Sequence, residues 1–271
     1  MKSFEDAVVV VAGAASGIGR ATALTFSRLG ARLVLADIQP LDGVAGEVAA
    51  AGRAPRAFPL DVAELGQVNA FAAAVLHEFG RVDVVVNSAG VLVLGETRLV
   101  PVEDLRWIMA VNFWGVVHLL HAFLPSMVER KRGHFVNISS PNAMAPVPYV
   151  GAYAASKSAM TVLSETLRLE VARYGVGVTT VCPGFTRTGL RGGARYRSDN
   201  RAGEEFLARV RERIERTEMD PFKVAGKIPD AVRKNRALVR ISAETYFLSW
   251  GYRFAPGLFR RIAQAIYRRT P

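Results

Sequence analysis

Short β-branched runs alternate with longer helical patterns along most of the chain, and this alternation constrains the fold more than any other feature. Apolar strands that alternate with helices indicate a parallel sheet with helices on both faces, which binds ligands beyond the carboxyl ends of its strands. The sequence therefore predicts an α/β fold with a doubly wound parallel sheet. The predicted strands are residues 7–12, 32–36, 56–60, 82–86, 134–138 and 177–181. The predicted helices are residues 18–29, 41–51, 64–79, 102–129 and 152–173.

The length of 271 residues suits one α/β domain with a small appendage, and half of the residues are hydrophobic, which is enough for a large core. The first apolar run, at 7–12, has the length of a strand and follows charged residues, so we expect no signal peptide. We also expect no segment that spans a bilayer. The single cysteine, Cys182, excludes an intramolecular disulfide and is typical of a reducing compartment. We predict a cytoplasmic protein.

A glycine-rich turn follows the first predicted strand and opens the first helix. Gly13, Gly17 and Gly19 let the backbone approach a pyrophosphate, which would lie on the helix amino terminus. Alone, such a turn could also be a tight strand–helix connection. Asp37 ends the second strand, where its carboxylate can accept hydrogen bonds from the adenosine ribose. Because this charge would repel a 2′-phosphate, it favours NAD over NADP.

Three further residues could meet on one small electrophile. Tyr153 and Lys157 are about one helical turn apart, so the phenol and the ammonium share a helix face. Ser140 follows the strand predicted at 134–138. A cation beside the phenol would lower its pKa from the usual value of about 10, and the serine could bind a carbonyl oxygen. This set suits carbonyl/alcohol interconversion if a cofactor carries the hydride, although Tyr and Lys at this spacing also occur in ordinary helices.

Taken together, these motifs resemble the short-chain dehydrogenase/reductase family in its compact, single-domain form. The resemblance covers roughly residues 5–190, with all motifs in the family's order and spacing. It implies a Rossmann-type fold and an oxidoreductase that uses NAD, with NADP as the alternative, and it implies no metal. The family's cofactor-binding positions correspond to Gly13, Ser16, Gly17, Ile18, Gly19, Asp37, Ile38, Asp61, Val62, Asn87, Ala89, Gly90, Tyr153, Lys157, Pro183, Gly184, Phe185 and Thr188.

The same resemblance implies a catalytic role for four residues. Tyr153 would be the general acid/base, and Lys157 would lower its pKa and bind the nicotinamide ribose. Ser140 would orient the substrate oxygen. Asn112 would hold a water that leads protons from Lys157 to solvent. Family members are commonly homodimers or homotetramers built on two long helices, which correspond here to 102–129 and 152–173.

Two supporting positions depart from the family pattern. Ala12 stands where the family usually has threonine, which removes a hydroxyl that can bond toward Asn87. Ser88 replaces the second asparagine of the family's Asn-Asn-Ala-Gly motif. We expect both changes to affect local stability more than activity.

The pocket over the nicotinamide should be apolar. In this family it is lined by the turn after Gly90, the segment before Tyr153 and the region after Pro183, and all three are apolar here. Such a pocket suits a lipophilic alcohol or ketone, such as a steroid, a retinoid or a fatty-acyl derivative. The expected lining residues are Val91, Leu92, Val93, Leu94, Ala145, Val147, Tyr149 and Phe185.

The formal net charge of +11 favours anionic partners, and arginines gather in residues 186–222. In the family this segment is a mobile lid, in which Gly189, Gly192 and Gly193 would permit hinge motion. Interspersed glutamates make a solvated helix face the simpler interpretation. A surface for coenzyme A or an acyl carrier protein is the alternative.

We predict a catalytic domain at residues 1–236 and a helical extension at 237–271. Residues 258–269 predict a helix with an apolar face surrounded by arginines. That face could lie in a membrane interface, or it could dock on the core or on a second subunit. The chain has no recognisable nucleic-acid-binding module, so we expect no nucleic acid partner.

The predicted function is NAD-dependent interconversion of a secondary alcohol and a ketone on a lipophilic substrate. One alternative is an NADP-dependent 3-oxoacyl reductase, which the basic lid favours and Asp37 opposes. A non-catalytic dinucleotide-sensing or scaffold protein is the alternative from another class, and the complete set of Ser140, Tyr153 and Lys157 opposes it.

Overall fold

The computed structural model describes residues 3–188, 190, 193–199, 204–205, 208, 212 and 219–268. Among these residues, seven strands form one sheet in which every pairing is parallel. These strands are β1 (Val8–Ala12), β2 (Arg32–Asp37), β3 (Arg56–Pro59), β4 (Val84–Asn87), β6 (Gly133–Ile138), β7 (Val176–Cys182) and β9 (Leu238–Arg240). Their order is β3-β2-β1-β4-β6-β7-β9, so the winding reverses between β1 and β4, where such sheets bind ligands.

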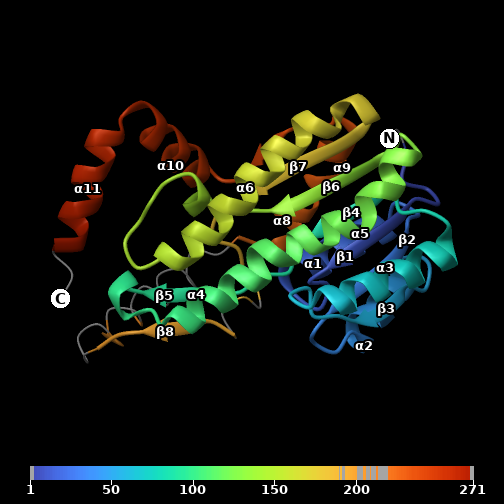
Figure 1. Ribbon diagram of the computed structural model, residues 1–271, viewed down its shortest axis with the longest axis horizontal. Coiled ribbons are helices and arrows are strands. Elements are labelled where there is room, and N and C mark those ends of the chain that lie inside the picture. Colours follow the sequence, from blue (N-terminus) through green and yellow to red (C-terminus); the bar gives the residue numbers. More distant parts are fainter. Residues whose placement is uncertain are drawn as a thin grey trace.

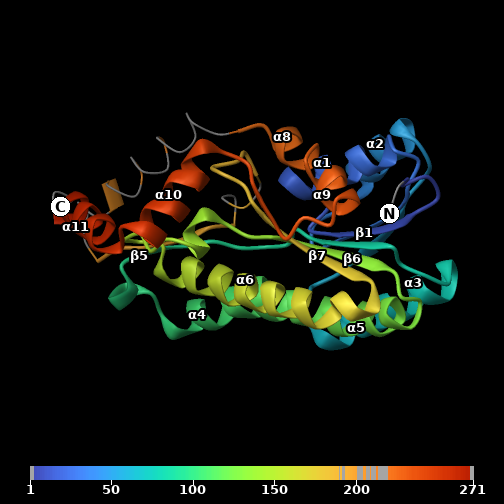
Figure 2. The same cartoon turned by 90° about the horizontal axis from the view of Figure 1, so that it is seen from above.

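Helices cover both faces of this sheet, as Figures 1 and 2 show. On one face lie α1 (Gly17–Ser27), α2 (Asp42–Ala51), α8 (Pro221–Ala225) and α9 (Ile228–Arg233). On the other lie α3 (Leu65–Phe79), α4 (Val102–Met109), α5 (Gly115–Glu129) and α6 (Gly151–Val171). The prediction of a Rossmann-type, doubly wound single domain is confirmed.

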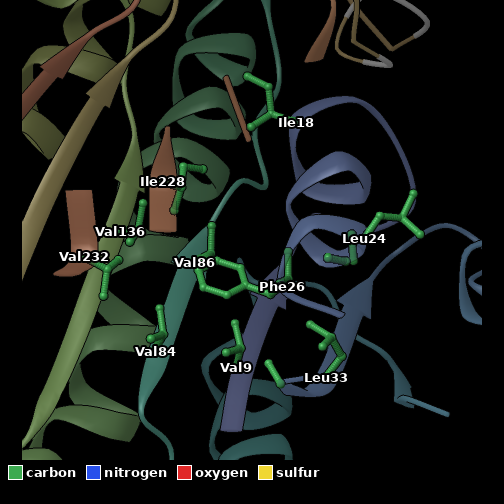
Figure 3. Packing of buried hydrophobic residues seen from close by; sticks show 14 of the residues in the cluster. Val9, Ile18, Leu24, Phe26, Leu33, Val84, Val86, Val136, Ile228 and Val232 are labelled. Atoms are coloured by element: carbon green, nitrogen blue, oxygen red, sulfur yellow. The ribbon is translucent and has the colours of Figure 1, made fainter. Parts of the chain in front are cut away.

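The valine-rich strands are buried on both faces because each face has its own apolar cluster. Figure 3 shows one cluster, in which Phe26 of α1 and Ile228 of α9 pack over valines from three strands. In the cluster of the opposite face, Phe71 and Phe123 meet edge to face, with ring centres 5.9 Å apart. Each fully buried side chain of this size contributes about 1.5–3 kcal/mol to the stability of the fold.

The helix predicted at 102–129 forms, but a π-helical turn, η2 (Ala110–Trp114), lies between α4 and α5. By length and composition this helix could cross a membrane, contrary to our expectation for the chain. In this fold its side chains Leu119, Phe123 and Met127 are buried in the core cluster over the sheet. Core helices of soluble proteins pass the same test of length and composition.

Several elements were not predicted. Strand β9 lies inside the segment predicted as an extension, and it forms the edge of the main sheet beside β7. Two short strands, β5 (Val93–Gly95) and β8 (Arg195–Arg197), pair separately. Helices α10 (Ala243–Phe254) and α11 (Pro256–Arg268) end the described chain, and α11 corresponds to the helix predicted at 258–269. Helix α11 lies at the end of the molecule far from β3 (Figure 1). Short helical turns occur at η1 (Thr97–Leu99), η3 (Pro141–Ala143) and η4 (Ala172–Tyr174).

Candidate active site

The glycine turn between β1 and α1 is packed so closely that it excludes larger residues. Gly13 has a φ of +80°, and a Cβ added there would lie 2.4 Å from the backbone nitrogen of Ala89. A Cβ on Gly19 would lie 1.8 Å from the carbonyl oxygen of Gly13. The turn therefore lies directly against the segment at 87–90, as the predicted cofactor site requires.

The amino terminus of α1 suits an anionic ligand. Ser16 precedes the helix without a side-chain cap, and the first turn has no acidic residue. No side chain therefore caps the backbone N–H groups in the first turn of α1, and they are available to a pyrophosphate. The helix dipole favours the negative charge of that group. A Cβ on Gly17 would lie 2.8 Å from the Cβ of Thr188, so the turn also meets the predicted nicotinamide segment. A cleft of about 360 Å³ opens here, between Gly17, Thr188 and Arg187.

Asp37 is fixed beside the turn at the end of β2. Its carboxylate accepts hydrogen bonds from the backbone N–H of Ala15, at 2.8 Å, and of Gln39, at 2.9 Å. The first cation after the turn, Arg20, is paired with Glu47 on α2. A carboxylate is therefore fixed at the predicted ribose position, and the arginine already has a carboxylate partner.

Three further residues predicted to bind the cofactor differ in exposure. Ile38, next to Asp37, is 68% exposed, so its side chain is open to a ligand. Val62 is buried, and its side chain lies against Gly115 of α5. Asp61 accepts a hydrogen bond from the N–H of Ala63 at 2.9 Å, which fixes the turn that leads into α3.

Ala12 is paired in register with a residue that has an unpaired buried polar atom. Ala12 and Asn87 are register partners on β1 and β4. Asn87 donates a hydrogen bond to Asn137 from its side-chain nitrogen, but its buried Oδ1 has no hydrogen-bond partner. A hydroxyl at position 12 is what the resemblance led us to expect there.

Ser140, Tyr153 and Lys157 are brought together beyond the carboxyl end of β6. Ser140 lies two residues beyond β6, and its hydroxyl accepts a hydrogen bond from the N–H of Asn142 at 3.2 Å. It is close enough to Tyr153 of α6 to influence the pKa of the phenol. The Nζ of Lys157 lies 6.0 Å from the centre of the Tyr153 ring and donates to the carbonyl oxygen of Ile138 at 2.9 Å. All three are less than 9% exposed, which places them in a largely dry site.

The pKa of Tyr153 does not follow the sequence expectation. Burial raises the pKa of Tyr153 to about 12, while the hydrogen bond from Ser140 acts in the opposite direction. Burial also lowers the pKa of Lys157 to about 8. Lys157 does not lower the pKa of Tyr153 here, and its ammonium donates to the carbonyl oxygen of Ile138. Desolvation has the largest effect on the pKa of both groups.

Asn112 lies in the π-helical turn and makes three hydrogen bonds. Its Oδ1 accepts from the N–H of Val91 at 2.8 Å, and its Nδ2 donates to the carbonyl oxygen of Val91 and to the hydroxyl of Ser156, both at 3.0 Å. A Cβ added to Gly90 would lie 3.2 Å from the Oδ1 of Asn112 and 3.4 Å from the Nζ of Lys157. Asn112 thus fixes the segment after Gly90 beside the lysine.

Part of the predicted substrate lining lies beside Tyr153. Val91, Leu92 and Val93 belong to one apolar cluster with its ring. Leu94 and Ala145 are buried without being part of that cluster, whereas Val147 and Tyr149 are half-buried in the loop before α6. Phe185 is 41% exposed.

Sequence reasoning missed several residues around this cluster. Leu190 and Trp107 pack on it, and Arg195 lies over the Trp107 ring, 3.7 Å from its centre. Asp104 is buried and binds Arg195 and Arg197 of β8, each at 2.6 Å. These contacts form because β8 pairs with β5, which is distant in the sequence, and no sequence motif indicates that pairing. About half of the predicted lid, including two of its three expected hinges, Gly189 and Gly192, lies outside the described residues.

One known family model covers most of the chain. The sequence profile described as short chain dehydrogenase matches residues 7–198. The chain is 38% identical over 268 residues to the Mycobacterium tuberculosis protein named “Probable oxidoreductase EphD”, an alignment that covers 96% of this chain and 45% of that protein. This chain therefore spans less than half the length of that relative.

Two solved structures are among those that share the fold of this chain. A short-chain dehydrogenase from Streptomyces avermitilis matches with a TM-score of 0.85 and 31% identity, over 99% of this chain and all of the other. A short chain dehydrogenase/reductase from Burkholderia phymatum in complex with NAD matches with a TM-score of 0.83 and 28% identity, over 100% of this chain and 98% of the other.

Proposed function

The chain belongs to the short-chain dehydrogenase family of oxidoreductases, and we propose that it interconverts a secondary alcohol and a ketone on a lipophilic substrate with NAD(H). The observation that carries this proposal is the convergence of Ser140, Tyr153 and Lys157 beyond the carboxyl ends of the parallel strands. The apolar cluster of Val91 to Val93 beside Tyr153 supports a lipophilic substrate.

Each residue has a task that its environment supports. Ser140 is close enough to Tyr153 to influence the pKa of the phenol, so both hydroxyls can bind one substrate oxygen. Tyr153 gives its proton to that oxygen in reduction and receives it in oxidation. In this structure Lys157 donates to the carbonyl oxygen of Ile138, and its ammonium would favour the phenolate once cofactor binding turns it toward Tyr153. Asn112 acts as a positioning residue, because its amide is bonded to Val91 and Ser156, and the water relay stays a prediction.

The residues present fit a dinucleotide. The uncapped amino terminus of α1 and the close-packed glycines would hold the pyrophosphate, and Asp37 would bind the adenosine ribose. Thr188, which lies against Gly17, would hold the nicotinamide end. A bound nicotinamide would supply the hydride donor or acceptor. The NAD complex of the Burkholderia phymatum relative supports NAD as the cofactor.

Tyr153→Phe tests the proposal, because it keeps the ring in its apolar cluster and removes only the hydroxyl. With NAD and a panel of hydrophobic secondary alcohols, we expect a loss of turnover of about 100-fold or more. NADH binding, followed by fluorescence titration, should be unchanged. A variant that turns over at the wild-type rate would exclude the phenol as the acid/base group. Bound NADH without turnover of any alcohol by the wild type would favour the sensing or scaffold alternative.

Asp37→Ala tests the choice of cofactor. Removing the carboxylate should lower the ratio of the dissociation constant of NADPH to that of NADH. The same titration measures both constants. Tighter binding of NADPH by the wild type would contradict this assignment and favour the 3-oxoacyl reductase alternative.

A further inference from the structure

Helix α10 presents an aromatic face that the rest of the described chain leaves exposed. Phe247, Trp250 and Phe254 are 74%, 57% and 73% exposed, and their spacing places them on one side of the helix. Thr245 and Ser249, on the opposite side, are buried. The helix therefore turns its polar side inward and its aromatic side outward, which is the reverse of the usual pattern for a surface helix.

Helix α11 continues this pattern. Leu258 and Ile262 are 61% and 51% exposed, while Phe259 packs edge to face on Tyr252 of α10 with ring centres 5.6 Å apart. Arg261 is also exposed. We call α10 and α11 together the C-terminal arm, residues 243–268.

Beyond Glu244 in the first turn of α10, the charged side chains of the arm are all arginines. Residues 251–271 contain five arginines and no carboxylate side chain. An exposed apolar face bordered mainly by cations complements a surface that is apolar inside and anionic outside. A second copy of the arm fits poorly, because a twofold contact would bring the arginines of one copy against those of the other.

The arm starts from the candidate active site. Helix α10 packs against η3, which follows Ser140. Ser242, which caps α10 by accepting from the N–H of Thr245 at 3.2 Å, lies so close to Gly184 that a Cβ there would be 2.4 Å from its hydroxyl. The arm therefore contacts two segments of the candidate site, the turn after Ser140 and the segment at Gly184.

We propose that the C-terminal arm docks on the headgroup region of an anionic lipid bilayer. Trp250 and the two phenylalanines of α10 enter the interface, and Arg253 and Arg261 contact the anionic headgroups. Because the arm is joined to the Ser140 and Gly184 segments, docking places the site near the bilayer. The docking itself does not depend on the proposed oxidoreductase activity.

Co-sedimentation of the full chain with vesicles tests this inference. The probes are phosphatidylcholine vesicles with and without phosphatidylglycerol. We expect binding to the anionic vesicles, about tenfold weaker binding to the neutral ones, and a decrease with added salt. Trp250→Ala/Phe254→Ala and Arg253→Glu/Arg261→Glu should each weaken anionic binding by about tenfold. The charge variant leaves the hydrogen bond between Arg260 and Tyr252 in place.

Two control variants match these changes elsewhere on the surface. Val162→Ala/Leu169→Ala removes exposed apolar side chains from α6, which are 64% and 79% exposed. Lys223→Glu/Lys227→Glu changes the net charge by the same amount as the arginine variant. Both should bind vesicles as the wild type does, and far-ultraviolet circular dichroism should show every variant folded.

Three results would overturn the proposal. They are absence of wild-type binding to anionic vesicles, equal losses in the control variants, and a lipid-free dimer that Trp250→Ala/Phe254→Ala converts to monomer in sedimentation velocity. The last result would assign the aromatic face to a second copy of the chain.

Discussion

Lys157 places its ammonium nitrogen 2.9 Å from the carbonyl oxygen of Ile138, which joins α6 to the last residue of β6. Burial lowers the pKa of Lys157 from 10.5 to about 8. Between these two values the unfolded chain binds more protons than the folded one, so this lysine makes stability rise with pH across that window.

Lys157→Met should remove this rise, because methionine fills a similar volume without titrating. From pH 8 to pH 10 the free energy of unfolding of the wild type should increase by about 2 kcal/mol relative to that of the variant. Urea unfolding at the two pH values measures the difference. Equal slopes in the two proteins would mean that the lysine keeps its ordinary pKa.

Asn112→Ala should destabilise the protein by about 2–3 kcal/mol, since it leaves the backbone groups of Val91 unpaired. If the proposed function holds, the KM for apolar alcohols should rise as the segment after Gly90 loosens. Asn69→Ala on α3, where the side chain is exposed, is the matched control and should have almost no effect. Similar losses in the two variants in urea unfolding would contradict this role of Asn112.

The sequence predicted the main strands well because they are short apolar runs that alternate with longer helical patterns. The strand predicted at 7–12 forms at Val8–Ala12, and the one predicted at 134–138 forms at Gly133–Ile138. Strands β5 and β8 could not be predicted in the same way. Each has three residues, too few for a periodic pattern, and their pairing joins Val93 to Arg195, far along the chain.

Within the site, the sequence predicted which residues meet, but not their environment. Ser140, Tyr153 and Lys157 converge as the motif spacing indicated. The pKa of Tyr153 was expected to fall, but burial raises it, and burial depends on residues such as Trp107 and Leu190 that no motif identifies. Tyr149 has a φ of +66° just before α6, a conformation that the loop around it imposes.

Ala12→Ser should stabilise the protein by about 1 kcal/mol, because its hydroxyl can donate to the unpaired Oδ1 of Asn87 on the neighbouring strand. Ala36→Ser is the matched control, since Ala36 is equally buried on β2, on the other side of β1. There the new hydroxyl should destabilise the fold by about 1–3 kcal/mol. Thermal and urea unfolding compare the two. A loss of stability in both variants would mean that the hydroxyl at position 12 cannot reach Asn87.

His134 should make the protein sensitive to acid. Burial lowers the pKa of His134 from 6.5 to about 3. The hydroxyl of Thr179 donates to the carbonyl oxygen of Arg236 at 2.7 Å, so it can only accept from the Nε2 of His134, at 2.8 Å. The imidazole is therefore neutral with its proton on Nε2.

Between pH 6.5 and pH 3 the unfolded chain binds the extra proton, so the stability that His134 gives near neutral pH is lost as the pH falls. From pH 7 to pH 5 the free energy of unfolding should fall by about 2 kcal/mol more in the wild type than in His134→Gln, which keeps a donor for Thr179. His77→Gln, at an exposed site on α3, should behave like the wild type. If urea unfolding gives the same pH dependence for His134→Gln and His77→Gln, a group other than His134 causes the acid sensitivity.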